Sequence, residues 1–238
     1  MVSIRIATFL SLALNLFAQP NPLLTAEQRA DILMARKMYR EAVETYQQDS
    51  LDSPVILNKI GIAYHQMLQL DLARKYYERS LKVNPKYAEA INNLGTIYYA
   101  RKNLRRAIGA YKKALHLTPN SASIYSNLGT AQFARKKYKE ASESYQKALA
   151  LDPEVFEHRS SYGTLLLERT VAEKAKFHYY LAKTYANAGN TERAIQYIRM
   201  ALEEGFKERQ KLMEEPEFAR LRETAEFKEL MATEPRVL

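Results

Sequence analysis

The chain has 238 residues, of which 47% are hydrophobic and 26% are charged, and it contains 7 glycines, 17 tyrosines and no cysteine. The apolar content is that of a folded protein and excludes a wholly disordered chain, while the lack of cysteine excludes a disulfide scaffold, a thiolate metal site and lipid attached to cysteine. The net charge of +9 suggests at first a nucleic acid or an anionic surface as partner.

The first 18 residues are predicted to be an export signal. After Arg5, the residues from Ile6 to Ala18 are uncharged and mostly apolar. Such a helix would span roughly 20 Å, too little for a hydrocarbon core of about 30 Å. We expect residues 1–18 to be a signal peptide and 19–24 a linker, which places the protein in the periplasm or outside the cell without a membrane-spanning segment. The alternative is a membrane anchor formed by an uncleaved N-terminus.

A period of 34 residues governs the chain from residue 54 to residue 155. Prolines, glycines, alanines and tyrosines all recur at this interval: Pro85, Pro119, Pro153, Gly61, Gly95, Gly129, Ala73, Ala107, Ala141, Tyr77, Tyr111 and Tyr145. Each unit contains two amphipathic helical stretches, with small residues that allow close helix approach and a proline that ends the second helix. The sequence therefore predicts three helix pairs, in 54–87, 88–121 and 122–155.

The spacing within each unit resembles the tetratricopeptide repeat. The unit 88–121 matches its pattern at Ile91, Leu94, Gly95, Tyr98, Ala107, Tyr111 and Pro119, and in the third unit Gln132 replaces one tyrosine. The resemblance implies an all-α fold, a right-handed superhelical solenoid of antiparallel helix pairs whose first helices line a concave groove.

Degenerate units flank the three regular ones. Residues 25–53 fit a repeat with a loop three residues shorter, and residues 175–208 return to the register. Between them, residues 156–174 leave room for one helix and not for a pair, so we expect an unpaired helix where the stack changes phase. Residues 209–238 are expected to form two short helices around Pro216 that cap the open end of the solenoid.

The resemblance also indicates which side chains line the groove: Asn58, Asn92, Asn93, Thr96, Tyr99, Asn127, Thr130 and Phe133. An asparagine amide both donates and accepts, so Asn93 and Asn127 suit the backbone of an extended peptide, and the aromatic rings suit its side chains. The alternative is that these asparagines support the geometry of the solenoid. Of the residues with which some members clamp a chaperone's C-terminal carboxylates, only Asn93 is present, since positions 58 and 62 are Asn and Ile and positions 123 and 127 are Ser and Asn. The resemblance therefore does not extend to this clamp.

Residues 54–121 carry the whole charge excess, with 12 Lys and Arg against 3 Asp and Glu. Basic residues also gather at two predicted turns between helices, one in the repeat 88–121 and one at the same place in the repeat 122–155. They are Arg101, Lys102, Arg105, Arg106, Arg135, Lys136, Lys137 and Lys139. Stacking would align these turns as a basic edge away from the groove. Such an edge attracts an acidic protein, anionic lipid or a phosphate-bearing polymer, with binding that weakens as salt rises. The alternative is a solvated edge that keeps the protein soluble.

Nothing in the sequence indicates catalysis. The histidines fall at unrelated repeat positions without a metal-binding spacing, and they are His65, His116, His158 and His178. We expect no catalytic residue, cofactor or metal, and a scaffold that binds a protein or peptide partner in its groove. The alternatives are an electrostatic binder acting through the basic edge and an accessory subunit of an envelope complex. Export argues against nucleic acid as the partner.

Overall fold

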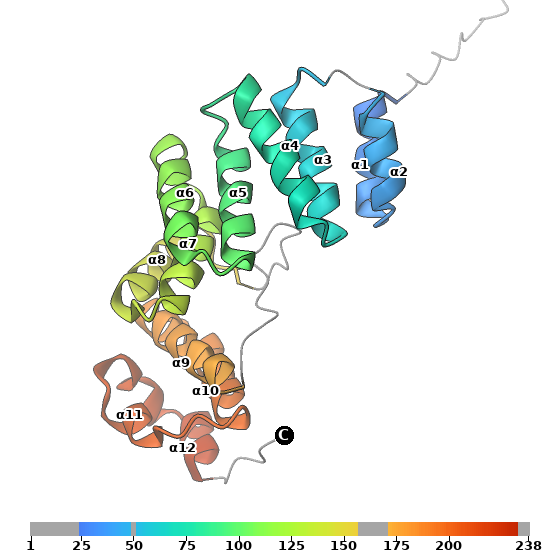
Figure 1. Cartoon of the computed structure of the whole chain (residues 1–238). Coiled ribbons are helices and arrows are strands. Elements are labelled where there is room, and N and C mark those ends of the chain that lie inside the picture. Colours follow the sequence, from blue (N-terminus) through green and yellow to red (C-terminus); the bar gives the residue numbers. More distant parts are fainter. Residues whose placement is uncertain (1–23, 49–50, 157–170, 233–238) are drawn as a thin grey trace, which may run out of the picture.

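A computed structural model describes residues 24–48, 51–156 and 171–232, and within them every regular element is a helix. Ten helices form five antiparallel pairs, followed by a short C-terminal cap (Figure 1). The paired helices are α1 Ala26–Ala35, α2 Tyr39–Tyr46, α3 Pro54–Gln66, α4 Leu70–Val83, α5 Ala88–Ala100, α6 Leu104–Leu117, α7 Ala122–Ala134, α8 Tyr138–Leu151, α9 Val171–Asn187 and α10 Thr191–Glu203. The cap contains α11 Arg209–Glu214, 3₁₀ turns at Pro216–Phe218 and Leu221–Glu223, and α12 Ala225–Ala232.

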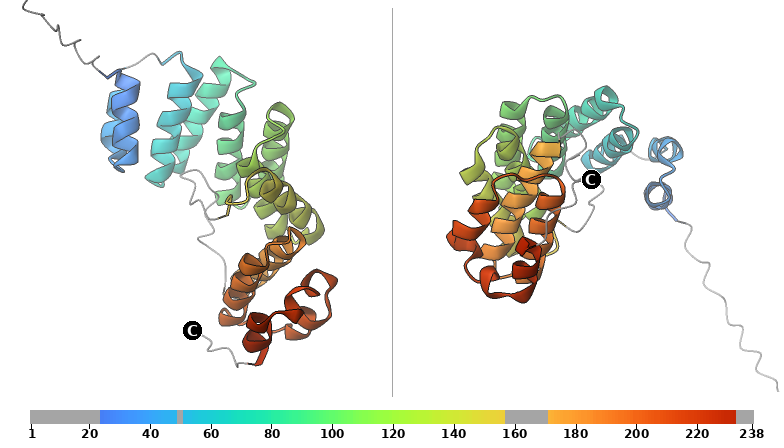
Figure 2. Two further views of the ribbon diagram at one scale, coloured as in Figure 1. Left: turned by 180° about the vertical axis from the view of Figure 1, so that it is seen from behind. Right: turned by 90° about the horizontal axis from the view of Figure 1, so that it is seen from below.

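The helix pairs stack side by side in chain order. Figures 1 and 2 show a curved stack with α1 and α2 at one end and the cap at the other. This architecture confirms the predicted helical solenoid. The proposed signal peptide, residues 1–18, lies outside the described residues, and no helix among those that are described has the length and apolarity to cross a membrane.

Local sequence signals explain where the helices begin and end. Thr25 and Gln28 form a reciprocal capping box at α1, and Ser53 accepts a hydrogen bond from the Ile56 amide while Pro54 occupies the first position of α3. At the other ends, α4, α6 and α8 stop two residues before a proline, which cannot continue a helix.

The turns inside the helix pairs contain a residue with left-handed backbone. Leu68, Lys102 and Lys136 have φ angles of 60°, 59° and 61°, and Lys37 takes the same conformation in the first pair. Only the fifth pair has a glycine here, Gly189, with φ of 78°. Because a side chain crowds the backbone in this conformation, the other four pairs hold local strain.

Three glycines allow the two helices of a regular repeat to touch. A Cβ built on Gly61, Gly95 or Gly129 would lie 2.5–2.6 Å from the ring of the buried tyrosine on the second helix, at Tyr77, Tyr111 and Tyr145. The flanking repeats have alanine instead of glycine at this position. Ala182 and the smaller Ile198 occupy the equivalent positions of the fifth pair, and Ala30 and Tyr46 occupy those of the first pair, at the open end of the stack.

Aromatic side chains join the fourth pair to the fifth. The ring of Phe133 packs edge-on against Phe177 and Tyr180, and Tyr138 stacks on Tyr180 with ring centroids 5.0 Å apart. The helix α9 begins at Val171, ahead of the repeat start expected at residue 175, and the remainder of the expected unpaired helix, residues 157–170, lies outside the described residues. The phase change is therefore accommodated by an aromatic junction.

The C-terminal cap covers the last helix pair. Leu212, Phe218, Leu221 and Phe227 are almost completely buried, and Tyr179 of α9 stacks on Phe206 at 4.5 Å between ring centroids. Between the cap helices lies Pro216, as the expected capping segment requires, although the chain there forms 3₁₀ turns in addition to two short α-helices. The apolar end of the solenoid is thus shielded from water.

Candidate functional site

A continuous run of amide hydrogen bonds joins the first helices of three repeats. The Nδ2 of Asn127 donates to Oδ1 of Asn92 at 3.0 Å, Asn92 donates to Asn93 at 3.2 Å, and Asn93 donates to Asn58 at 3.0 Å. All four side chains are buried, with at most 7% of their surface exposed. We call these four residues the amide ladder. Because buried amides need partners, the ladder fixes α3, α5 and α7 in register.

At both ends of the stack, residues equivalent to the ladder asparagines contact acidic side chains instead: Lys59 is equivalent to Asn93, and Tyr179 is equivalent to Asn92. At the N-terminal end, Lys59 Nζ lies 2.7 Å from Glu27 and also contacts Asp31, and these hydrogen bonds raise the pKa of Lys59 although burial opposes its charge. At the C-terminal end, the hydroxyl of Tyr179 donates to the Glu215 carboxylate of the cap. Burial first, and then this hydrogen bond, raises the pKa of Tyr179.

Lys183 reinforces the cap contact. Its Nζ lies 2.9 Å from Glu215 and 3.1 Å from Glu217. Burial opposes the charged form, but the two carboxylates outweigh it and raise the pKa of Lys183. Tyr179 and Lys183 of α9 therefore both contact the cap.

Burial changes what the predicted groove residues can contact. The four asparagines bond to one another, Thr96 Oγ1 donates to the Asn93 carbonyl at 2.7 Å, and Thr130 Oγ1 accepts from the buried Tyr145 hydroxyl at 3.3 Å. Phe133 belongs to the aromatic junction. Of the eight predicted residues, Tyr99 alone keeps a partly exposed side chain. The geometry therefore favours the supporting role for the asparagines.

The basic edge is exposed along the turns of two consecutive repeats. Its eight residues all reach solvent, and their contacts include those of Arg101 with Asp71, Lys137 with Glu140 at 2.6 Å, and Arg106 with the ring of Tyr98 at 5.8 Å. The two turns join α5 to α6 and α7 to α8, and Arg101 and Arg135 from these turns line one recess, so the turns lie side by side along one edge.

A recess opens within the basic edge. It has a volume of about 470 Å³ and is lined by Arg101, Lys102, Asn103, Leu104, Arg105 and Arg135. The first five residues come from the turn before α6 and its first helical turn, and Arg135 is the residue that ends α7 one repeat later. Sequence reasoning identified the basic residues but not the recess, because its shape depends on how two consecutive turns pack.

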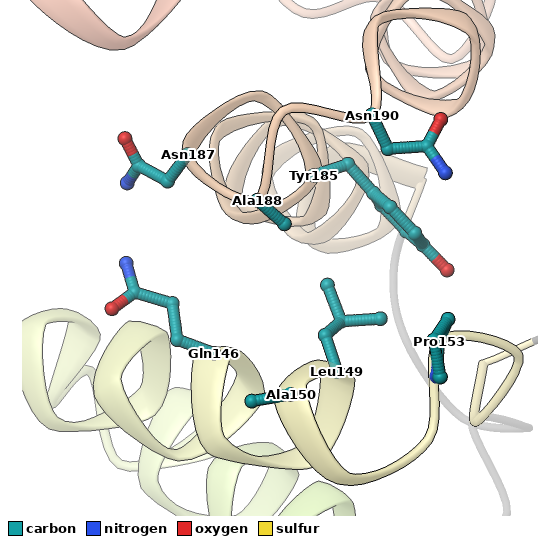
Figure 3. A pocket seen from close by; sticks show the side chains of 8 residues that line it. All are labelled: Gln146, Leu149, Ala150, Pro153, Tyr185, Asn187, Ala188 and Asn190. Carbon is teal, nitrogen blue, oxygen red and sulfur yellow. The ribbon is translucent and has the colours of Figure 1, made fainter.

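A second pocket lies where α8 meets α9 and α10 (Figure 3). Its volume is about 640 Å³, and its lining carries no charged side chain: Gln146, Leu149, Ala150, Pro153, Tyr185, Asn187, Ala188 and Asn190. The side-chain amides of Gln146 of α8 and Asn187 of α9 approach each other at one side of the pocket, away from Leu149 (Figure 3). No repeat signal predicts this pocket, because it forms where the 34-residue period is interrupted.

Of the described histidines, His65 and His178 are partly buried and His116 is exposed. His178 Nδ1 lies 2.5 Å from Glu204 between α9 and α10, and burial lowers the pKa of His65 on α3. Within residues 24–48, 51–156 and 171–232 no three His, Asp or Glu side chains are placed to hold a metal ion. The fourth histidine, His158, lies outside these ranges.

Comparisons with known proteins agree with the repeat geometry. Family profiles described as tetratricopeptide repeat match residues 54–87, 122–155, 76–109 and 178–204, and one described as TPR repeat matches 95–135. A search of the curated proteins finds no match.

Two solved structures show the same fold. One is MamA 41-end from Desulfovibrio magneticus RS-1, with 19% identity, coverage of 75% of this chain and 92% of that chain, and a TM-score of 0.51. The other is MamA AMB-1, with 21% identity, coverage of 76% and 98%, and a TM-score of 0.51. The chain belongs to the tetratricopeptide repeat family.

Proposed function

We propose that this protein is a non-enzymatic scaffold that binds an extended segment of a protein partner along the concave face formed by α3, α5 and α7. The amide ladder is the observation that carries this proposal. By fixing the three helices in register, it lets side chains at equivalent positions form one continuous surface. A preorganised surface loses less conformational entropy on binding than a mobile one.

The contacts would come from side chains around the ladder. His65 and Tyr99 occupy equivalent positions of successive repeats and are partly exposed, and Ser123 and Ser126 extend the surface on α7. An aromatic side chain that is partly exposed on a rigid helix suits an anchoring contact, since it adds apolar area with few torsions to immobilise. We therefore assign the first contact to Tyr99.

The test compares two neighbouring tyrosines. Affinity capture with the wild-type protein and mass spectrometry would identify the partner, and its affinity would then be measured for Tyr99→Ala and for Tyr98→Ala. Loss of an anchor is expected to weaken binding about tenfold or more. Tyr98 is the matched control, because it is partly exposed on the same helix and contacts Arg106 of the basic edge. If the two variants bound the partner with equal affinity, the proposal that the partner binds along the concave face would be wrong.

A second candidate function uses the basic edge, and the recess within it is the observation that favours this function. A tethering role as an accessory subunit of an envelope complex is compatible with either surface. Salt separates the two surfaces: binding through the concave face would survive moderate salt, whereas binding through the basic edge would weaken as the salt concentration rises.

We also propose that the protein is exported and that residues 1–18 are removed as a signal peptide. The support is the short apolar run that follows Arg5 and ends at Ala18. N-terminal sequencing of the protein recovered from its native host would give Gln19 as the first residue. An intact Met1 would contradict cleavage and favour the N-terminal anchor.

A further inference from the structure

The recess in the basic edge brings together guanidinium groups from two repeats. Arg101 and Arg105 flank the turn before α6, and Arg135 approaches from the end of α7. No described carboxylate pairs with Arg105 or Arg135, whereas Arg101 already donates to Asp71 of α4. The side chain of Asp71 is 92% exposed, so this pair is open to exchange with an external carboxylate.

The chemistry of the recess suits a carboxylate. A guanidinium group offers a planar pair of donors that matches two carboxylate oxygens, and Arg101 at the recess edge already donates from one nitrogen to one oxygen of Asp71. None of the six lining residues is acidic.

Consecutive repeats give the ligand a spacing. The turn Arg135–Lys137 follows Arg101–Asn103 by one repeat, and the bond between Asn92 and Asn127 shows that α5 and α7 are direct neighbours. Packed helices lie roughly 8–10 Å apart, which is about three residues of a polyproline II chain at roughly 3.1 Å each. Because this extended conformation has three residues per turn, a segment with an acidic residue at every third position would place one carboxylate at each turn.

We propose that the recess lined by Arg101, Arg105 and Arg135 is a binding site for an acidic, extended segment of a protein partner, with Asp or Glu at every third position. This site is separate from the concave face, since its residues lie in the turns between helices. Charge complementarity carries the assignment: the two repeats that form the recess, residues 88–155, hold 11 Lys and Arg against 5 Asp and Glu.

The experiment uses the full-length protein and a fluorescein-labelled peptide with Glu at every third position. Fluorescence anisotropy would measure its affinity for wild type, for Arg105→Glu/Arg135→Glu, and for Lys75→Glu/Lys113→Glu. The lysine pair is the matched control: both side chains are exposed outside the recess, and the change in net charge is the same. Circular dichroism would verify that both variants are folded.

The arginine variant is expected to bind the peptide about tenfold more weakly than wild type, because two charge-assisted contacts are lost, and the lysine variant to change affinity far less. A peptide with Gln in place of Glu should not bind, and raising the salt should weaken the wild-type complex. Equal losses in both variants would overturn the proposal, because they would show a general field effect. Binding to phosphatidylglycerol vesicles or to tripolyphosphate through the same arginines, without binding to the peptide, would also overturn it. Neither outcome involves Tyr99, so the proposed scaffold function is tested separately.

Discussion

The Nδ2 atom of Asn93 donates to the Oδ1 atom of Asn58 at 3.0 Å, and this bond crosses the boundary between two repeats. Both side chains are buried on the first helices of their repeats. A residue type that the sequence suggested for ligand contact therefore also links one repeat to the next. Stability measurements can separate these two roles.

Replacing Asn93 by Ala is expected to lower the free energy of unfolding by about 1–3 kcal/mol, because Asn58 and Asn92 lose their buried partner. Urea denaturation would measure the change. Asn187→Ala is the control, since this amide is exposed and should change stability by no more than about 0.5 kcal/mol. The supporting role of the ladder would be refuted by equal, small effects of the two substitutions.

Gly95→Ala and Gly109→Ala are expected to act in opposite directions. A Cβ on Gly95 would lie 2.6 Å from Tyr111, and overpacking of about 1–3 kcal/mol outweighs a gain in helix propensity of about 1 kcal/mol. Gly109 is exposed on α6 with no atom near a new Cβ, so its substitution should stabilise by about 0.5–1 kcal/mol. Urea denaturation of both variants checks the signs.

The Gly95 substitution has a natural rescue. The fifth repeat combines Ala182 with Ile198 at the equivalent positions, both fully buried. Adding Tyr111→Ile to Gly95→Ala should therefore destabilise less than the two single changes summed. Additive effects would show that the glycine and the tyrosine do not share one contact.

Leu68→Gly should stabilise the protein by about 0.5–1 kcal/mol. The left-handed backbone costs a residue with a side chain about 1–2 kcal/mol. Glycine avoids this cost, but part of the gain is lost because glycine loses more conformational entropy when the chain folds. The side chain of Leu68 is 69% exposed, so little packing is lost. Thermal unfolding would record a higher midpoint. Gly189→Ala, with φ of 78°, should lower it, and a shift of the same sign for both would contradict the strain argument.

His65 should make the protein less stable in mild acid. Burial lowers its pKa in the folded chain, so the unfolded chain takes up the proton first as the pH falls below about 6.5. Stability is then lost with a slope of at most about 1.4 kcal/mol per pH unit until the folded pKa is reached. Denaturation of wild type and His65→Gln between neutral pH and pH 5 measures this. His116→Gln, at an exposed position, serves as control, and parallel curves for wild type and His65→Gln would contradict the assignment.

The helix pairs were predictable because one repeat period set both their length and their facing sides. Gly95, Ala107 and Tyr111 recur at intervals that place small and large residues opposite each other, and the structure pairs them accordingly. The family pattern also located Asn58, Asn93 and Asn127 on the first helices. A single sequence does not encode where an amide points, so the hydrogen bonds among them required coordinates.

Features that depend on two repeats at once escaped prediction. The recess needs Arg105 and Arg135 from successive turns, and the pocket beside Leu149 forms where the period is interrupted. The cap contacts of Tyr179 and Lys183 were missed for the same reason, since their partners lie about one repeat away in a segment without repeat signals.

The amide ladder has a consequence for how the protein could be lengthened. In the unit 88–121, Asn93 bonds to the preceding unit and Asn92 bonds to the following unit. If this unit were duplicated in tandem, Asn93 of the second copy would therefore lie next to Asn92 of the first, in the same arrangement as Asn93 and Asn58. Such a unit is interchangeable, and arrays of any length could be assembled from it. A copy inserted before α9 would instead set an amide against Tyr180, whose neighbours are Phe133 and Tyr138. A further repeat can therefore be inserted among the repeats linked by the amide ladder, but not at the aromatic junction before α9.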